Sequence, residues 1–521
     1  MTDPADDRVA DDEAEADEPE AKDSPADKQE EAPRGRELPP RVHLVVGLLA
    51  PIIALLINAW RVRWFTVDDA YISYRYARNL ARGWGLVFNQ GEAIEGYTNF
   101  GWTVLLAGGI SVGIDPDVLA KVVGAASAAG TLTLCYFLSR RFAPFKLAPC
   151  FATWLLASSM PTIGYAMFGL ETSFFVFLVV AALYAMFVEH ERPGAFPWSG
   201  IIFGLAGLTR PEAPMFLGIP MLLLGRKFFG RQNLLRGIIF VAIVGAHMLW
   251  RKNYYGEWLP NTFTAKTGDP VQQFHRGKSY IAGYLGEAGP AVYLVFAGAA
   301  IAVVRKHREM LSLAALSIAV CGYIMTIGGD WMPHFRFMAP FEPFAFVLVG
   351  VGARTLFDTH QRPIQLAIVM FALYVGVQRY HSFEDARRHF KGEDEFWESA
   401  VNQSAEWLVE HNRPGYIAVA DMGYIGYRTD FPVLDLLGLV DPVISRLPGG
   451  YTKKTGPGYV KRVFEVMPRY FVLVGGRDCT KLSFKAQRKL RKHPKFRRNY
   501  YLAKVIMHSK KGAWCIFERE D

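Results

Sequence analysis

The sequence predicts a polytopic α-helical membrane protein with about 11 spans and a C-terminal extracytoplasmic α/β domain. A content of 51% hydrophobic residues would by itself allow a soluble protein, so the distribution of these residues decides. They form blocks of about 14–21 residues with almost no charge, close to the roughly 20 residues that cross a bilayer. Lys and Arg collect between the blocks, and the last part of the chain has a mixed polar composition.

The N-terminal segment, residues 1–40, differs from the rest of the chain. Its first 38 residues contain 15 Asp or Glu and 5 Lys or Arg, with few large apolar side chains. Because such a composition cannot bury a core, we expect a disordered acidic tail on the cytoplasmic side. The apolar block that follows, 44–60, is long for the hydrophobic part of a cleaved signal peptide, so we expect it to stay as the first span.

Residues 41–379 form the predicted transmembrane domain. Two of its apolar blocks are short and meet at Arg210-Pro211, which predicts kinked or partly buried helices at that point. The expected spans lie near residues 44–60, 118–139, 147–168, 171–188, 198–210, 212–225, 235–250, 289–304, 310–327, 337–353 and 363–378.

The positive charges between the blocks indicate the orientation. If the Gly-interrupted segment Phe100–Ile114 is interfacial or re-entrant, all the basic clusters fall on the side of the N-terminus, namely 140–146, 226–236, 305–308 and 354–362. We therefore expect a cytoplasmic N-terminus, an external C-terminus and a large first outer loop at 61–117. This placement also accounts for the basic excess of the chain, so nucleic acid is not expected as a partner.

Residues 380–521 form the predicted extracytoplasmic α/β domain. Stretches with a helical pattern alternate with strand-like runs at Tyr416–Ala420, Tyr470–Val474 and Tyr500–Ile506. The helical stretches are Glu395–Asn412 and Phe484–Lys492. Cys479 and Cys515 could pair outside the cytoplasm, but whether they do depends on their separation in space, which the sequence leaves open.

The first outer loop carries two adjacent carboxylates, Asp68 and Asp69. They precede an amphipathic stretch in which Ile72, Tyr76 and Leu80 recur at helical spacing. Asp at a helix start is ordinary capping, and this structural reading stays open. The functional alternative is that two neighbouring carboxylates split their pKa values, which leaves one of them as a general base.

Several fragments of the chain resemble one superfamily. They are Val67-Asp68-Asp69-Ala70-Tyr71, the continuation Asn89 to Asn99, Gly169-Leu170-Glu171-Thr172, Gly207-Leu208-Thr209-Arg210-Pro211-Glu212, Tyr254-Tyr255-Gly256, Pro260-Asn261-Thr262 and Gly328-Gly329-Asp330. Over residues 44–450 the chain resembles the glycosyltransferase-C enzymes, and within them the bacterial terminal β-1,2-arabinofuranosyltransferases of actinobacterial cell walls and their relatives. The first-loop motif is the specific part. Tyr97-Thr98-Asn99 and the stretch Trp331 to His334 depart from the arabinosyl pattern, so the identity of the sugar stays open.

The resemblance implies an inverting glycosyltransferase with a polyprenyl-phosphate sugar donor, arabinofuranose being one candidate sugar. It implies the bacterial cytoplasmic membrane as location, an external active site, and a glycan, lipid or protein of the cell envelope as acceptor. Asp68 or Asp69 would be the base, with Asp68 favoured because it stands just ahead of the helix. No metal-ligand cluster is expected, although a divalent metal is left open as a cofactor.

The chemistry also needs cations for the departing lipid phosphate. The candidates lie at or near the outer ends of spans: Arg210, Lys266, His334 and Arg336. Snorkelling at the membrane interface is the alternative for each, and pairing with Glu212 is a further alternative for Arg210. The substrate-binding candidates that the resemblance implies are Glu95, Tyr97, Glu171, Asn261 and Asp330.

Two rival functions belong to other classes. A transporter or flippase of a lipid-linked sugar would also place charges at the ends of spans, but it should show two repeated halves, which the sequence lacks. A membrane scaffold would make the C-terminal domain the working part. The large outer loop and the absence of a repeat favour the enzyme.

Overall fold

The computed structural model describes residues 39–520, apart from 143–147, 193, 224–228, 267, 358–360, 451–453, 455 and 509–511. The expected acidic tail, residues 1–40, lies almost entirely outside the described residues, as do Arg226 and Lys227 of one basic cluster. Leu38–Asp521 belong to one structural unit, and the description below concerns this unit.

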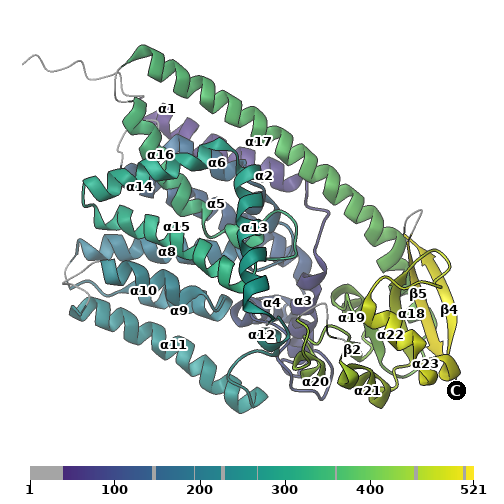
Figure 1. The fold of residues 1–521 in the computed structure, drawn as a ribbon. Coiled ribbons are helices and arrows are strands. Elements are labelled where there is room, and N and C mark those ends of the chain that lie inside the picture. Colours follow the sequence, from purple (N-terminus) through teal and green to yellow (C-terminus); the bar gives the residue numbers. More distant parts are fainter. Residues whose placement is uncertain are drawn as a thin grey trace, which may run out of the picture. The chain divides into compact units, whose positions relative to one another are not determined.

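Helices occupy the predicted apolar blocks (Figure 1). The first is a 21-residue helix, Pro40–Trp60, built from α1 (Pro40–Leu44), a π-helical turn (Val45–Leu49) and α2 (Ala50–Trp60). The others are α5 (Pro116–Phe142), α6 (Ala148–Ala157), α7 (Met160–Tyr165), α8 (Thr172–His190), α9 (Trp198–Thr209), α10 (Ala213–Leu223), α11 (Arg231–Tyr255), α14 (Leu294–Val304), α15 (Arg308–Ile327), α16 (Glu342–Phe357) and α17 (Arg362–Phe396).

Five helices of the described part are long and apolar enough to cross a bilayer, or six if the bent pair Pro270–Ala288 and Pro290–Val304 counts as one span. The helices α9 and α10 have only 12 and 11 residues, as expected for the short blocks that meet at Arg210-Pro211. The prediction of a polytopic helical membrane protein is confirmed. The number of about 11 spans stays a prediction.

Charged side chains join several helix ends. Arg141 of α5 pairs with Glu309 of α15 at 2.7 Å and with Glu191, which directly follows α8, also at 2.7 Å. Arg236 of α11 pairs with Glu189 of α8 at 2.9 Å. The basic clusters near 140, 236 and 308 therefore lie at one end of the helix bundle, as the positive-inside rule requires of a cytoplasmic end.

Helices also lie between the predicted spans, among them α4 and α13. α4 (Phe100–Ser111) has 12 residues and so a length of about 18 Å, which agrees with an interfacial or re-entrant segment. α13 (Pro270–Ala288) was not predicted, because its polar residues resemble an outer loop. It is bent by 110° against Pro290–Val304. Its start carries a recognisable signal, since Asp269 accepts hydrogen bonds from two backbone N–H groups and Pro270 is the first helical residue.

The C-terminal part begins within α17, which runs without a break through residue 380, where the sequence places the domain boundary. Figure 1 shows α17 leading from the bundle to the sheet.

The C-terminal sheet has five strands in the order β2-β1-β3-β5-β4. The strands are β1 (Ile417–Val419), β2 (Val433–Asp435), β3 (Tyr470–Gly475), β4 (Tyr500–Met507) and β5 (Ala513–Arg519). β1 is parallel to β2 and β3, and β5 is antiparallel to β3 and β4. β1, β3 and β4 match the predicted strand-like runs, whereas the short β2 and the last strand β5 were missed.

Alternating side chains give this sheet two buried faces. Ile417 and Val472 pack with Ile72 and Tyr76 of the first outer loop. The opposite face packs on helices of the domain itself, namely α21 (Pro457–Val466), α22 (Lys485–Lys492) and α23 (Pro494–Asn499). The C-terminal domain therefore shares one core with the first outer loop.

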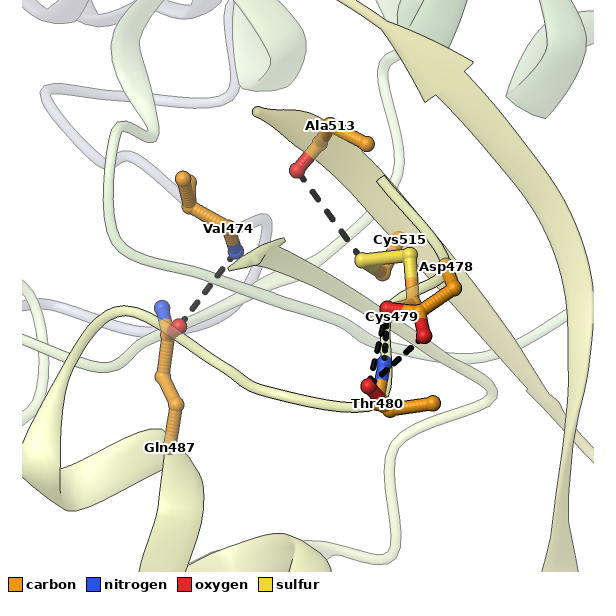
Figure 2. Close-up of a disulfide and its surroundings, with 7 residues drawn as sticks. All are labelled: Val474, Asp478, Cys479, Thr480, Gln487, Ala513 and Cys515. Carbon is orange, nitrogen blue, oxygen red and sulfur yellow. Dashed lines mark hydrogen bonds between the residues drawn. A yellow bond between two sulfur atoms is a disulfide. The ribbon is translucent and has the colours of Figure 1, made fainter. Parts of the chain in front are cut away.

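Cys479 and Cys515 form a disulfide, which settles the question that the sequence left open (Figure 2). Their Cα atoms are 5.8 Å apart, and the bond joins the loop after β3 to β5. Beside it, the Asp478 carboxylate accepts a hydrogen bond from Thr480 N at 3.1 Å. Structural disulfides form in oxidising compartments, which agrees with an extracytoplasmic domain.

Candidate active site

The candidate site begins at helix α3 (Asp68–Ala81) in the first outer loop. Asp68 and Asp69 are its first two residues, and their negative charge suits the positive end of the helix dipole. The N-cap is Val67, which makes no side-chain cap hydrogen bond. Capping of α3 is therefore not the role of either carboxylate.

Asp68 binds a helix of the C-terminal domain. Its Oδ2 accepts a hydrogen bond from Gly423 N at 2.9 Å, and its Oδ1 accepts one from Tyr424 N at 2.8 Å. Gly423 begins α19 (Gly423–Thr429), so Asp68 caps a helix that lies far along the chain. Burial and the nearby charges of Asp421 and Asp69 raise the pKa of Asp68 to about 7. Both oxygens of Asp68 are already engaged.

Asp69 has different surroundings. Burial raises its pKa above the ordinary value for an Asp, and the negative charges of Asp330 and Glu171 act in the same direction. The positive charges of Lys266 and Arg336 act against this rise. Asp69 therefore lies among the residues that the sequence assigned to donor and substrate binding, while its side chain keeps some exposure.

A buried ion cluster forms one wall of the site. Arg210 Nη1 lies 2.8 Å from Glu171 Oε1, and Arg210 Nε lies 2.5 Å from Glu212 Oε1. Glu171 Oε2 also accepts a hydrogen bond from Asn99 Nδ2 at 2.8 Å. From the sequence, an ion pair with Glu212 was the structural alternative for Arg210, and the structure shows this ion pair. Arg210 is thus held in place by two carboxylates.

A strained turn supplies the second guanidinium. Arg336 Nε lies 2.6 Å from Asp330 Oδ2, and both side chains are almost fully buried. Between them, His334 and Phe335 have positive φ values of 57° and 53°. Such conformations of residues other than Gly cost about 1–3 kcal/mol each, and packing must hold them. The turn therefore holds the Arg336 guanidinium in place near Asp69.

A narrow cavity adjoins Arg210 and Arg336, and the centre of a water molecule can occupy about 10 Å³ of it, which is room for about one water. Its lining combines these cations with aromatic and aliphatic side chains. The lining residues are Thr172, Phe175, Arg210, Glu212, Met215, Phe216, Val320, Tyr323, Arg336, Phe337 and Pro340.

Three predicted substrate-binding residues make other contacts. Glu95 lies 2.7 Å from the Arg251 guanidinium, and Tyr97 and Tyr255 share a hydrogen bond of 3.1 Å between their hydroxyl groups. Asn261 Nδ2 donates to the carbonyl oxygens of Gly438 and Leu439, at 2.8 and 2.9 Å. These contacts join the loops to one another and to the C-terminal domain.

His334 also lies apart from the cluster. Its Nδ1 is 3.5 Å from Glu287 Oε1, and it lines a second cavity with His381 and His389 of α17. The strained turn that positions Arg336 directs the His334 side chain to this second cavity. Among the described residues, no group of three or more His, Cys, Asp or Glu is arranged to hold a metal ion.

Two polar residues near the site were not singled out from the sequence. Asn99 fixes Glu171, and Asp421 influences the pKa of Asp68. Asp421 stands directly after the predicted strand Tyr416–Ala420, and a carboxylate at the end of a strand is a signal that could have identified it. The partner of Asn99 could not be inferred, because Glu171 is 72 residues away.

A helical membrane bundle, a carboxylate-bearing loop after the first helix and a small C-terminal α/β domain together define a class of fold. The chain is a multi-pass membrane protein with the glycosyltransferase-C fold, as the sequence predicted. Residues 113–327 match glycosyltransferase family 87, and residues 389–517 match a domain of unknown function.

Two curated relatives carry the same description, terminal β-(1→2)-arabinofuranosyltransferase. The protein of Corynebacterium glutamicum is 26% identical over 434 residues, which cover 70% of this chain and 60% of the relative. The protein of Mycobacterium tuberculosis is 30% identical over 268 residues, which cover 47% of this chain and 41% of the relative. The chain thus spans less than two thirds of the length of these relatives.

Solved structures show the same fold at low sequence identity. ArnT from Cupriavidus metallidurans, bound to undecaprenyl phosphate, is 13% identical with a TM-score of 0.59, over 92% of this chain and 98% of ArnT. The oligosaccharyltransferase AglB from Archaeoglobus fulgidus, in complex with an inhibitory peptide and a dolichol phosphate, is 13% identical with a TM-score of 0.52, over 81% of this chain and 69% of AglB.

Proposed function

We propose that this chain is an inverting glycosyltransferase that moves a sugar from a polyprenyl-phosphate donor to a cell-envelope acceptor. The lipid phosphates bound to ArnT and AglB support this class of donor. The names of the two curated relatives support arabinofuranose as the sugar. The acceptor is a hydroxyl group of a glycan, lipid or protein, and the reaction takes place on the outer face of the bacterial cytoplasmic membrane.

One observation carries the proposal: the carboxylate of Asp69 lies among the charges of Lys266, Arg336, Asp330 and Glu171. A carboxylate near cations is the arrangement that sugar transfer from a lipid phosphate requires. The carboxylate takes a proton where the new bond forms. The cations stabilise the phosphate where the old bond breaks.

The reaction follows from this arrangement. The acceptor hydroxyl attacks the anomeric carbon of the donor sugar while its proton passes to the Asp69 carboxylate. A new bond forms between the acceptor oxygen and the anomeric carbon, and the bond from that carbon to the phosphate oxygen breaks. The lipid phosphate leaves with the bonding electrons. Attack from the face opposite the phosphate inverts the configuration.

We place the base at Asp69, whereas the sequence argument favoured Asp68. Asp68 already accepts two backbone hydrogen bonds from α19, so it is suited to hold the start of α3 in place. Burial raises the pKa of both carboxyl groups, so basicity does not separate them. Asp69 differs because it makes no such contact with α19 and lies among the charges of Lys266 and Arg336. Asp68 then acts as a positioning residue.

We assign the binding of the donor phosphate to Arg336 and Lys266, and a supporting role to Arg210. Arg210 is paired with two carboxylates, so most of its charge is compensated within the protein. Arg336 has one carboxylate partner, Asp330, and Lys266 is exposed at the end of α12 (Asn261–Lys266). A phosphate held between Arg336 and Lys266 would accept charge-assisted hydrogen bonds from the guanidinium and ammonium groups.

The test compares Asp69→Asn with Asp68→Asn in purified full-length protein. We expect Asp69→Asn to bind the polyprenyl-phosphate arabinose donor normally and to lose about 10²–10⁴-fold in transfer rate. We expect Asp68→Asn to lose less, because the amide oxygen still accepts one N–H bond. Transfer by Asp69→Asn at the wild-type rate would rule out Asp69 as base. Movement of intact donor across vesicles without release of lipid phosphate would support the flippase instead.

A further inference from the structure

We infer that the C-terminal domain, part of which matches a domain of unknown function, positions the catalytic carboxylates by clamping helix α3. The clamp consists of the contacts between α3 and α19. The inference rests on the proposed function and assigns a role within it to residues 389–517.

Side chains of α3 bind both ends of α19. The Asp68 carboxylate accepts hydrogen bonds from the N–H groups of Gly423 and Tyr424 at the start of α19. Toward its end, Arg75 Nη1 donates to Gly426 O at 2.5 Å, and Arg78 Nη1 donates to Tyr427 O at 2.8 Å. A negative group at the start of a helix and positive groups near its end both match the helix dipole. The two helices therefore fit together in one register.

The buried Arg75 strengthens this contact. Arg75 is 3% exposed. Its guanidinium donates hydrogen bonds to three backbone carbonyls, of Phe88 in the outer loop and of Gly426 and Phe431 in the C-terminal domain. Separation of the domain from α3 would remove two of these acceptors from a buried charged group, which is costly. The hydrogen bonds of Arg75 therefore stabilise the clamp.

Two glycines of α19 face α3. A Cβ atom at Gly423 would lie closer to the Asp68 carbonyl oxygen than van der Waals contact allows. A Cβ atom at Gly426 would lie 2.8 Å from Arg75 Nη1 and 3.0 Å from a ring carbon of Phe88. The close approach at Gly423 involves the backbone of the residue next to Asp69. A side chain at position 423 would therefore displace the start of α3.

The first experiment tests the clamp with Gly423→Ala in the full-length protein. The matched control is Gly456→Ala in the same domain, where a Cβ atom would meet nothing within 4 Å. We expect Gly423→Ala to keep the wild-type affinity for polyprenyl-phosphate arabinose and to lose about 10- to 100-fold in transfer rate, because a small displacement of the base is sufficient. The control should behave as wild type. A wild-type transfer rate in folded Gly423→Ala would overturn the clamp.

The second experiment decides the matter if Gly423→Ala does not fold. Arg78→Gln removes the hydrogen bond from Arg78 to Tyr427 O near the end of α19, and Glu465→Gln on the exposed side of α21 is the control. We expect Arg78→Gln to keep the wild-type donor affinity and to lose about 10-fold in transfer rate, because the base is displaced. A wild-type transfer rate in Arg78→Gln would overturn the clamp. If the wild type transfers no sugar from any polyprenyl-phosphate donor, the proposed function fails; if wild type and variants transfer equally, only the clamp fails.

Discussion

Asp68 and Asp69 are neighbours in the sequence, yet they bind different parts of the molecule. Consecutive residues of a helix point about 100° apart, so one carboxylate turns toward α19 and the other toward the charged cluster. The sequence could propose both as candidates but could not divide the roles. The partner of Asp68 is 355 residues away, and no local pattern indicates it.

Glu95 offers a prediction at the same scale. Burial raises its pKa to about 7, while the Arg251 guanidinium at 2.7 Å lowers it. We expect Arg251→Met to destabilise the protein by about 3–5 kcal/mol, because the variant leaves Glu95 buried without a partner. The measurement is thermal unfolding in detergent. The double variant Glu95→Gln/Arg251→Met should be more stable than Arg251→Met, and equal stabilities would contradict a structural ion pair.

The pH dependence of Arg251→Met has a definite sign. A carboxyl group with a raised pKa binds a proton in the folded state at pH values where the unfolded state has lost it. Stability therefore falls as pH rises from about 4.5 to about 7. Loss of Arg251 raises the pKa of Glu95 further, so this fall should continue to higher pH in Arg251→Met than in wild type. Thermal unfolding midpoints of the wild type and of Arg251→Met, measured between pH 5 and 8, test this difference.

At the scale of elements, helix positions follow from hydrophobic blocks, while helix contacts depend on small residues. α14 and α16 pack closely, and a Cβ atom at Gly298 of α14 would collide with the backbone carbonyl of Leu348 in α16. Small residues allow such backbone approach in membrane helices. The sequence located both helices and gave no indication that these two meet.

Gly298→Ala tests this packing. Ala favours an isolated helix by about 1 kcal/mol over Gly, so a helix without this contact would gain stability. We expect the opposite here, a loss of about 1–3 kcal/mol from overpacking, seen as a lower unfolding midpoint. Gly322→Ala in α15 is the control, since a Cβ atom there meets nothing within 4 Å. Equal midpoints for the two variants would show that the α14–α16 contact is looser than described.

At the scale of the whole molecule, orientation in the membrane is the main proposal. The ion pairs of Arg141 and Arg236 place three basic clusters at one end of the bundle, and His43 Nδ1 of α1 lies 3.0 Å from the Tyr136 hydroxyl near the same end of α5. The disulfide lies in the C-terminal domain, which agrees with an external location. We propose that this end of the bundle and the N-terminus are cytoplasmic.

Alkaline phosphatase fusions test the orientation, because the enzyme folds only outside the cytoplasm. A fusion after residue 142 should be inactive, and one after residue 412 should be active. A fusion after Trp64, in the first outer loop, serves as a second external point. Activity at 142 together with inactivity at 412 would reverse the topology.

The sequence by itself determined the fold class, the apolar blocks that became helices, three of the five strands and the first-loop carboxylates. These features depend on local composition and periodicity, which a single chain displays. The tertiary structure alone decided the bend at Gly289, the pairing of Cys479 with Cys515, and the contacts of Asp68 with Gly423 and of Arg210 with Glu171. Each of these depends on which distant segments pack together, because burial and long-range hydrogen bonds are set by the whole chain and leave no local periodic signal.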